Sequence, residues 1–206
     1  MRVTITHTTR LDYSAEVVEA VMDMRVGPLS DAHQRWDIYE IGASPSAAVR
    51  RYGDGFGNVA HLVTVSRPHR HVEVVTRGEV DVLLEDPFAL PIGSIRPLMP
   101  AELHDYLSPS TLIPRFAELD ALATPHRPSD PQGTFEAVQR LMTDVYRSFT
   151  YRKDVTTVAT TVPEVLKGRT GVCQDFAHLL TGLCRAIDIP ARYVSGYIVA
   201  DAPEMA

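Results

Sequence analysis

Prolines are unevenly distributed along this chain of 206 residues. Nine of the 15 prolines lie between Pro87 and Pro131. Because proline lacks a backbone N–H and fixes φ, so dense a run excludes long helices and central strands. We therefore expect a connecting segment that wraps the surface or joins two domains, with a β-rich domain at residues 1–100 and a second domain at residues 101–206.

The chain before this segment has the residue pattern of β-strands. Apolar residues alternate with polar ones from Val3 to Leu11, which is the period of a half-buried strand. The segment from Glu16 to Val26 is predicted to be a strand, although its alanine, glutamate and methionine content also fits a helix. Further strands are expected at Gln34–Ile41, Arg50–Tyr52, Val59–Val65, His71–Thr76 and Glu79–Leu84.

Two glycine-containing segments predict turns within this β-rich domain. GDGFGN, from Gly53 to Asn58, specifies a tight turn with positive φ angles and hence a hairpin. A phosphate-binding loop is the alternative, but the lysine of a P-loop is absent, and arginines rather than a buried strand precede the segment. Arg77 and Gly78 are expected to separate the last two strands.

The chain after the proline-rich segment has helical periodicity. Helices are expected at Pro114–Ala123, from Thr134 onward, at Pro163–Lys167 and from Cys173 to near Asp188. In the helix that Thr134 caps, one apolar face is expected to contain Phe135, Val138, Leu141, Met142, Val145 and Phe149. After Pro190, the segment from Ala191 to Val199 alternates like a strand.

Cys173 is the main candidate for chemistry. A glycine-bearing turn, Gly168 to Gly171, leads directly into apolar residues at helical spacing, so Cys173 should lie in the first turn of a buried helix. There the unpaired N–H groups and the positive end of the helix dipole favour a thiolate, the nucleophilic form of the side chain. On position alone, a cysteine in a helix is more often a small buried hydrophobic residue than a catalyst.

Three other polar or sulfur-containing residues of this helix are not expected to take part in catalysis. Asp175 lies about 200° around the helix axis, where its carboxylate can accept from N-terminal donors as structural support. His178 lies about 140° around the axis and about 7.5 Å along it, a poor position for proton transfer with Cys173. Cys184 is about 16 Å away, too far for a disulfide, and is expected to be a packed core thiol.

Composition excludes several classes of function. The net charge is −6 with acidic and basic residues mixed along the chain, which argues against nucleic acid and anionic membranes as partners. Neither a signal-peptide pattern nor a run of about eighteen apolar residues occurs, so we expect a cytoplasmic location. No metal and no cofactor are predicted, because paired ligand motifs are absent and His69 with His71 lacks a third ligand.

GVCQDFAHLLTGLCRAIDIPARYVSGYI, from Gly171 to Ile198, resembles the nucleophile segment of the bacterial transglutaminase-like superfamily. HTTRLDYS near the N-terminus, Gln34 and the DGFGN turn resemble the β domain that precedes the core in many of these proteins. The resemblance implies an α+β fold, with an N-terminal antiparallel β domain followed by the helical front part of a papain-like core. It also implies that Cys173 attacks carboxamides or peptide carbonyls.

In this family a histidine in an HAW-type strand and an aspartate near a DPT-type turn follow the cysteine by tens of residues. After Ile198 only Val199 to Ala206 follow here, and none of them is histidine. The resemblance therefore assigns Cys173 alone, and we expect a chain truncated before the catalytic histidine and aspartate, with an incomplete core sheet. By itself it should show little or no turnover, because losing triad members costs several orders of magnitude in rate.

Two classes of function stay open at this point. The first is thiol-dependent acyl transfer from a protein or peptide substrate, in which water as acceptor gives a peptidase or amidase and an amine gives a transglutaminase. The residues do not distinguish these acceptors. The second is a non-catalytic binding or assembly module, in which the β domain and the exposed edge of the Ala191–Val199 strand contact other chains and form a homodimer or exchange strands.

Overall fold

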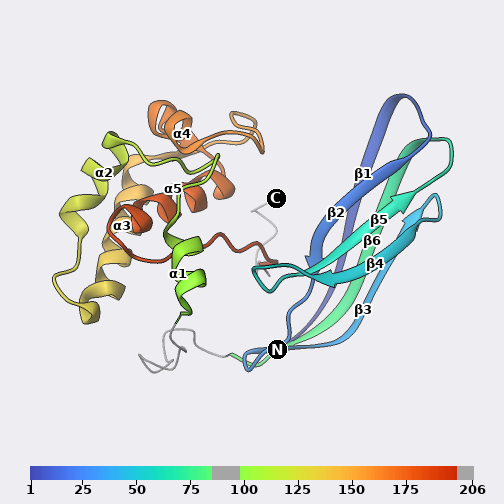
Figure 1. The fold of residues 1–206 in the computed structure, drawn as a ribbon, viewed down its shortest axis with the longest axis horizontal. Coiled ribbons are helices and arrows are strands. Elements are labelled where there is room, and N and C mark those ends of the chain that lie inside the picture. Colours follow the sequence, from blue (N-terminus) through green and yellow to red (C-terminus); the bar gives the residue numbers. More distant parts are fainter. Residues whose placement is uncertain (85–97, 199–206) are drawn as a thin grey trace. The chain divides into compact units, whose positions relative to one another are not determined.

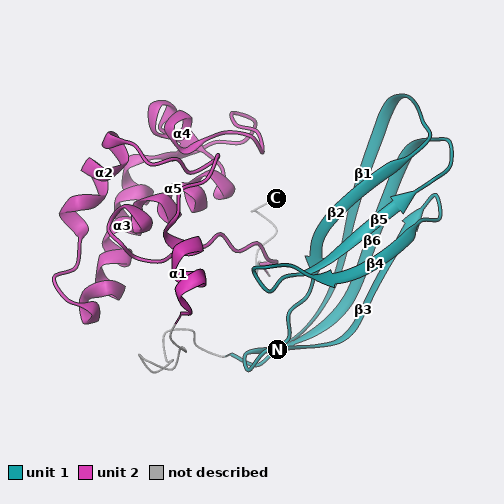
Figure 2. Ribbon diagram, in the orientation of Figure 1, with its two compact units in different colours: residues 1–95 teal, residues 96–206 magenta. Residues whose placement is uncertain are grey.

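The computed structural model describes residues 1–84 and 98–198 (Figure 1). The chain folds into two compact units, residues 1–95 and residues 96–206 (Figure 2). The described part of the first unit is built from strands, and the described helices all lie in the second unit. The predicted α+β fold, with its antiparallel β domain first in the chain, is thereby confirmed.

The first unit contains two three-stranded antiparallel sheets. One sheet has the order β1-β6-β3, formed by β1 Arg2–Val17, β6 His69–Val82 and β3 Gln34–Ser44. The other has the order β2-β5-β4, formed by β2 Ala20–Gly27, β5 Val59–Val65 and β4 Ala48–Gly53. The segment from Glu16 to Val26, whose composition also fitted a helix, therefore contributes to strands.

Side chains from both sheets meet in one apolar cluster. Its buried members are Ala20 of β2, Val63 and Val65 of β5, and Val72 and Val74 of β6. Partly buried residues packed against them include Tyr13, Met22, Met24, Ile41 and Ala43. Because each strand alternates its side chains between two faces, one face of each sheet supplies this core, and the unit is a β-sandwich.

A predicted hairpin joins β4 to β5, and its turn is organised by Asp54. One carboxylate oxygen of Asp54 accepts from the backbone N–H groups of Phe56 and Asn58, each at 2.9 Å, and the side-chain amide of Asn58 donates to the other. The hydrogen bond from Asn58 contributes most to lowering the pKa of Asp54 to about 2. Positive φ angles were expected at several positions of this turn, but Gly57 alone among its glycines adopts one, at 77°.

β6 is one continuous strand, so the prediction of two strands separated at Arg77 and Gly78 is wrong. A Cβ atom at Gly78 would lie 2.5 Å from the Trp36 ring and 2.7 Å from the carbonyl oxygen of Ile38. The register of β3 against β6 shifts between these same two residues, as in a β-bulge. The glycine therefore makes room for a neighbouring strand instead of turning the chain.

Replacing Gly78 by alanine is expected to lower the free energy of unfolding of the β-sandwich by about 1–3 kcal/mol, because the Ile38 backbone and the Trp36 ring must both move. Urea unfolding followed by tryptophan fluorescence measures this in the intact chain, since Trp36 is its single tryptophan. Gly42→Ala is the matched control: nothing lies within 4 Å of a Cβ there, so its effect should stay within about 0.5 kcal/mol. Equal effects of the two variants would contradict this explanation.

The second unit contains five described α-helices. They are α1 Pro100–Leu107, α2 Ala117–Ala123, α3 Thr134–Ser148, α4 Val162–Gly168 and α5 Cys173–Ala186. Short 3₁₀ helices lie at Thr124–His126 and Pro131–Gly133, and two-residue strands β7 Thr150–Tyr151 and β8 Thr170–Gly171 pair in parallel. None of these described helices is both long and apolar enough to cross a membrane.

α1 was not predicted: the proline density was taken to exclude long helices, and a short helix was expected only at Pro114–Ala123. Pro100 lies in the first turn, where a missing N–H leaves no hydrogen bond unmade. The Glu102 carboxylate accepts from the backbone N–H of Met99 at 2.8 Å and closes the start of the helix. The short helix expected at Pro114–Ala123 exists as α2 but begins at Ala117.

α5 is the central helix of the second unit, in contact with α2, α3 and α4 (Figure 1). Its buried residues include Leu179, Leu183, Cys184 and Ala186, and the cluster continues through Leu119, Leu141, Val145, Val162, Leu166 and Ile187. Four residues of the predicted apolar face lie in or against this cluster, namely Val138, Leu141, Val145 and Phe149, and Ala137 is also buried. Phe135 and Met142 are half exposed, at 52% and 53%. Thr134 is the first helical residue, with Gly133 at the N-cap position.

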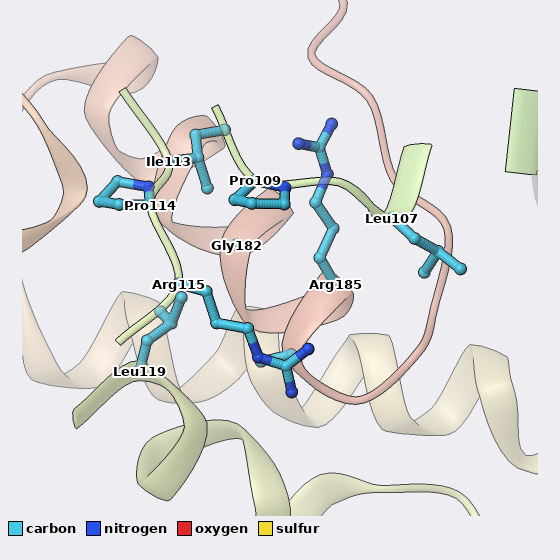
Figure 3. Close-up of a pocket in the computed structure, with 9 residues that line it drawn as sticks. Leu107, Pro109, Ile113, Pro114, Arg115, Leu119, Gly182 and Arg185 are labelled. Carbon is cyan, nitrogen blue, oxygen red and sulfur yellow. The ribbon is translucent and has the colours of Figure 1, made fainter. Parts of the chain in front are cut away.

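Arg185 determines the path of the chain after α5. Its guanidinium donates two hydrogen bonds to the carbonyl oxygen of Ala191, at 3.0 and 2.7 Å, and one to that of Ser108 at 2.6 Å. Figure 3 shows a small hollow beside it, lined among others by Leu107, Ile113, Arg115, Leu119 and Gly182. The cavity volume of about 20 Å³ is enough for one water molecule and too small for a substrate.

The strand predicted from Ala191 to Val199 is wrong for the described part of that range. Residues 191–198 have no regular secondary structure, and most of their side chains are exposed. Alternation of Tyr193, Ser195 and Tyr197 suggested a strand, but a strand also needs a neighbouring backbone, and no described segment pairs with this one. The sheet edge expected there is therefore not formed, and Val199 lies outside the described residues.

Candidate active site

Cys173 is the first residue of α5, which confirms its predicted place in the first turn. Its side chain is exposed, while the middle of the helix is buried. Val172 precedes it in an extended conformation, with φ −110° and ψ −179°. The N–H groups of a first helical turn have no acceptor within the helix, so the thiol lies at the positive end of the helix dipole.

The turn that leads into Cys173 is fixed by the parallel β7–β8 pair. The backbone N–H of Thr150 donates to the carbonyl oxygen of Arg169 at 2.9 Å, and that of Arg152 donates to Gly171 at 2.9 Å. Arg169 adopts a left-handed conformation, with φ 51°, where α4 ends. Its guanidinium lies 4.9 Å from the centre of the Phe149 ring, which anchors this unusual backbone position.

Asp175 is completely buried beneath this turn. One carboxylate oxygen, Oδ2, accepts from the backbone N–H of Val172 at 2.7 Å and from the Thr156 hydroxyl at 2.6 Å. A Cβ atom at Gly171 would lie 2.8 Å from that oxygen, so the carboxylate fits there because residue 171 is glycine. The predicted role of Asp175 as an acceptor for N-terminal donors is confirmed.

His178 lies one turn further along α5 and is buried. Its ring centre lies 5.0 Å from that of Tyr193, and Nδ1 has no hydrogen-bond partner among the described residues. Burial lowers the pKa of His178, although the nearby Asp175 opposes the change, so the imidazole is neutral at pH 7. No hydrogen bond joins His178 to Cys173 within the described residues.

Cys184 differs from Cys173 in its accessibility to solvent and reagents. It is buried in the apolar cluster around α5, and that burial raises the pKa of its thiol to about 11. Both cysteines are free thiols, as their separation along the helix predicted. Cys184 is thus a packed core residue, and Cys173 is the accessible thiol of the chain.

Iodoacetamide should therefore modify Cys173 selectively in the native protein. At pH 8 about one in a thousand Cys184 thiols would be ionised, and the apolar core excludes the reagent from it. Peptide mass mapping after limited alkylation measures the two sites separately. In urea both should react at similar rates, and comparable labelling of the two in the native chain would refute the assignment.

The described residues contain no group of three or more His, Cys, Asp or Glu side chains arranged to hold a metal ion. Of the two histidines considered as ligands, His69 is buried and His71 is exposed. The Nδ1 atom of His69 lies 2.6 Å from the carbonyl oxygen of Arg67, and its ring packs edge to face against Tyr13. His69 is therefore part of the β-sandwich interior.

Comparisons with known proteins match both parts of the chain. Residues 3–81 match the bacterial transglutaminase-like N-terminal region, and residues 121–204 match the transglutaminase-like superfamily. An uncharacterized protein of Mycobacterium tuberculosis is 32% identical over 216 residues, covering 98% of this chain and 67% of the relative. The chain belongs to the transglutaminase-like superfamily. This confirms the resemblance seen in the Cys173 segment and near the N-terminus.

Two further proteins are similar to this transglutaminase-like chain. A Mycobacterium leprae protein, also uncharacterized, is 26% identical over 204 residues, covering 96% of this chain and 71% of the relative. The crystal structure of a "Putative Cysteine Protease" from Cytophaga hutchinsonii has a TM-score of 0.71 at 18% identity, covering 92% of this chain and 65% of that one. At that identity the likeness establishes the fold alone. The chain thus spans about two thirds of the length of these relatives.

Proposed function

We propose that this transglutaminase-like protein takes part in thiol-dependent acyl transfer, with Cys173 as the nucleophile and a protein or peptide amide as acyl donor. The observation that supports the proposal is the position of Cys173: an exposed thiol on the first residue of a helix whose later residues are buried or partly buried. The unpaired N–H groups at a helix start attract negative charge, and the packed part of the helix holds the residue in place.

In the proposed acylation, Cys173 Sγ bonds to the carbonyl carbon while the carbonyl oxygen takes negative charge. The backbone N–H of Cys173, at the helix start, is suited to stabilise that oxyanion. The carbon–nitrogen bond then breaks, and the leaving amine needs a proton from a general acid. Neutral, buried His178 is not placed to supply it, so with the described residues alone water must protonate the leaving amine, and amide cleavage is expected to be slow.

p-Nitrophenyl acetate isolates this acylation step, because nitrophenolate leaves as an anion. The native chain is expected to release about one equivalent of nitrophenolate in a burst, followed by slow turnover, with acetyl found on Cys173. Absorbance at the nitrophenolate band and peptide mass mapping measure both. Cys173→Ala should remove the burst, whereas Cys184→Ala should keep it. A burst that survives Cys173→Ala, or acetyl spread over lysines, would count against the proposal.

The enzyme class depends on which molecule accepts the acyl group from Cys173. Water would make the protein a peptidase or amidase, and an amine would make it a transglutaminase. After acetylation of Cys173, hydrolysis and transfer to an added primary amine can be compared by mass spectrometry. Faster loss of the acetyl group to the amine than to water would support transglutamination.

A second candidate function, a binding or assembly module, is favoured by a different observation. The segment of residues 193–198 exposes apolar surface, on the side chains of Tyr193, Val194, Tyr197 and Ile198. Ile198 is the extreme case, at 92% exposed. Contiguous exposed apolar residues of this kind are typical of surfaces that associate with other chains.

If this segment mediates self-association, the molar mass from light scattering should rise with concentration toward that of a dimer. Ile198→Asp and Val194→Asp should return the protein to a monomer, because burying an unpaired carboxylate in an apolar interface is unfavourable. Val158→Asp, an exposed valine on another loop, is the control and should have no effect. A concentration-independent monomer would eliminate self-assembly as the function.

A further inference from the structure

The peptide unit between Gly171 and Val172 is held from both sides. Its carbonyl oxygen accepts from the backbone N–H of Arg152 at 2.9 Å, and its N–H donates to Asp175 Oδ2 at 2.7 Å. Because a peptide unit is planar and rigid, two hydrogen bonds at its opposite ends fix its orientation. The next peptide unit along the chain contains the N–H of Cys173.

The acceptor that holds this peptide is itself immobilised. Thr156, 19 residues earlier in the chain, donates its hydroxyl to the same carboxylate oxygen at 2.6 Å. Asp175 is 0% exposed, and its approach to the turn requires glycine at residue 171. The other oxygen, Oδ1, is buried without a hydrogen-bond partner among the described residues. Oδ2 therefore makes two hydrogen bonds, one that holds the turn at Val172 and one, from Thr156, that holds the carboxylate itself.

α5 does not depend on Asp175 for its existence. Leu179, Leu183 and Ile187 bury the later part of the helix against the other helices. The N-cap residue, Val172, has no side-chain acceptor to offer the first turn. Loss of the Asp175 carboxylate would therefore loosen the start of α5, where Cys173 lies, and leave the packed part in place.

We propose that Asp175 is a positioning residue for acylation of Cys173. By fixing the Gly171–Val172 peptide, its Oδ2 atom fixes the direction of the Cys173 N–H that receives the oxyanion, and Thr156 orients Oδ2 for this purpose. The inference rests on the proposed function. Asp175 contacts neither the acyl donor nor the thiol and acts through the backbone.

A ratio of two rates on the same thiol tests the proposal. Acetylation of Cys173 by p-nitrophenyl acetate passes through an oxyanion, whereas alkylation by iodoacetamide forms a carbon–sulfur bond and expels iodide without one. Changes in the thiolate fraction affect both rates alike and cancel in the ratio. Buried Cys184 reports the fold in the same samples, because it becomes alkylated if the helix cluster opens.

Asp175→Ala is expected to lower the acetylation-to-alkylation ratio on the order of 10-fold to 100-fold, the usual effect of misplacing a catalytic group. Asp175→Asn should keep most of the ratio, because its amide oxygen can occupy the Oδ2 position and accept both hydrogen bonds. Thr156→Val should lower it about fivefold, as expected for one lost hydrogen bond, and Thr156→Ser should restore it. Thr181→Val is the matched control, since among the described residues that hydroxyl donates only to the carbonyl oxygen of Ala177, within α5.

The outcomes separate the two proposals. A native ratio no higher than that of the urea-unfolded chain would overturn the proposed function itself. A high native ratio that Asp175→Ala and Thr156→Val leave unchanged would overturn the positioning role alone. An Asn variant as impaired as the Ala variant would overturn it too, since charge and not hydrogen-bond geometry would then matter. If Asp175→Ala exposes Cys184, the comparison of Thr156→Val with Thr181→Val decides.

Discussion

Burial of α5 among α2, α3 and α4 is the constraint on which the second unit depends. Leu179 and Leu183 are enclosed by side chains of all three neighbours, so the helix cannot shift or rotate without opening the cluster. The backbone of the first residue of such a helix is held in a fixed position by the packing of the rest. Cys173 therefore combines an exposed side chain with a rigid origin, which is what a site on a regular element offers over one on a loop.

Much of this organisation could be predicted from local sequence patterns. Alternation located the strands of the β-sandwich, and the change from glycine-rich turn to helical spacing located the start of α5 at Cys173. These predictions are correct because the periodicity of apolar residues reflects which side of a single helix or strand is buried. The prediction for Asp175 is correct because the interaction is local: its partner Val172 is three residues away in the chain.

Several features that sequence reasoning missed depend on partners distant in the chain. Gly78 was interpreted as a turn because its true reason, the Trp36 ring, lies 42 residues earlier on a neighbouring strand. Ala191 to Ile198 has a strand's alternation but no described neighbour to complete its hydrogen bonds. Thr156 and Arg152 could not be assigned to the site. Nothing in the sequence of their polar loop indicates that they donate hydrogen bonds to Asp175 and Gly171.

The different burial of the two thiols on α5 determines which of them is oxidised first. Peroxides convert accessible thiolates to sulfenic and then sulfinic acids, and they reach buried thiols last. Cys173 would be consumed first while Cys184 stays reduced inside an intact helix cluster. Oxidative damage would thus remove the reactive group from a molecule that still looks folded, so its structural integrity would be a poor guide to its chemical competence.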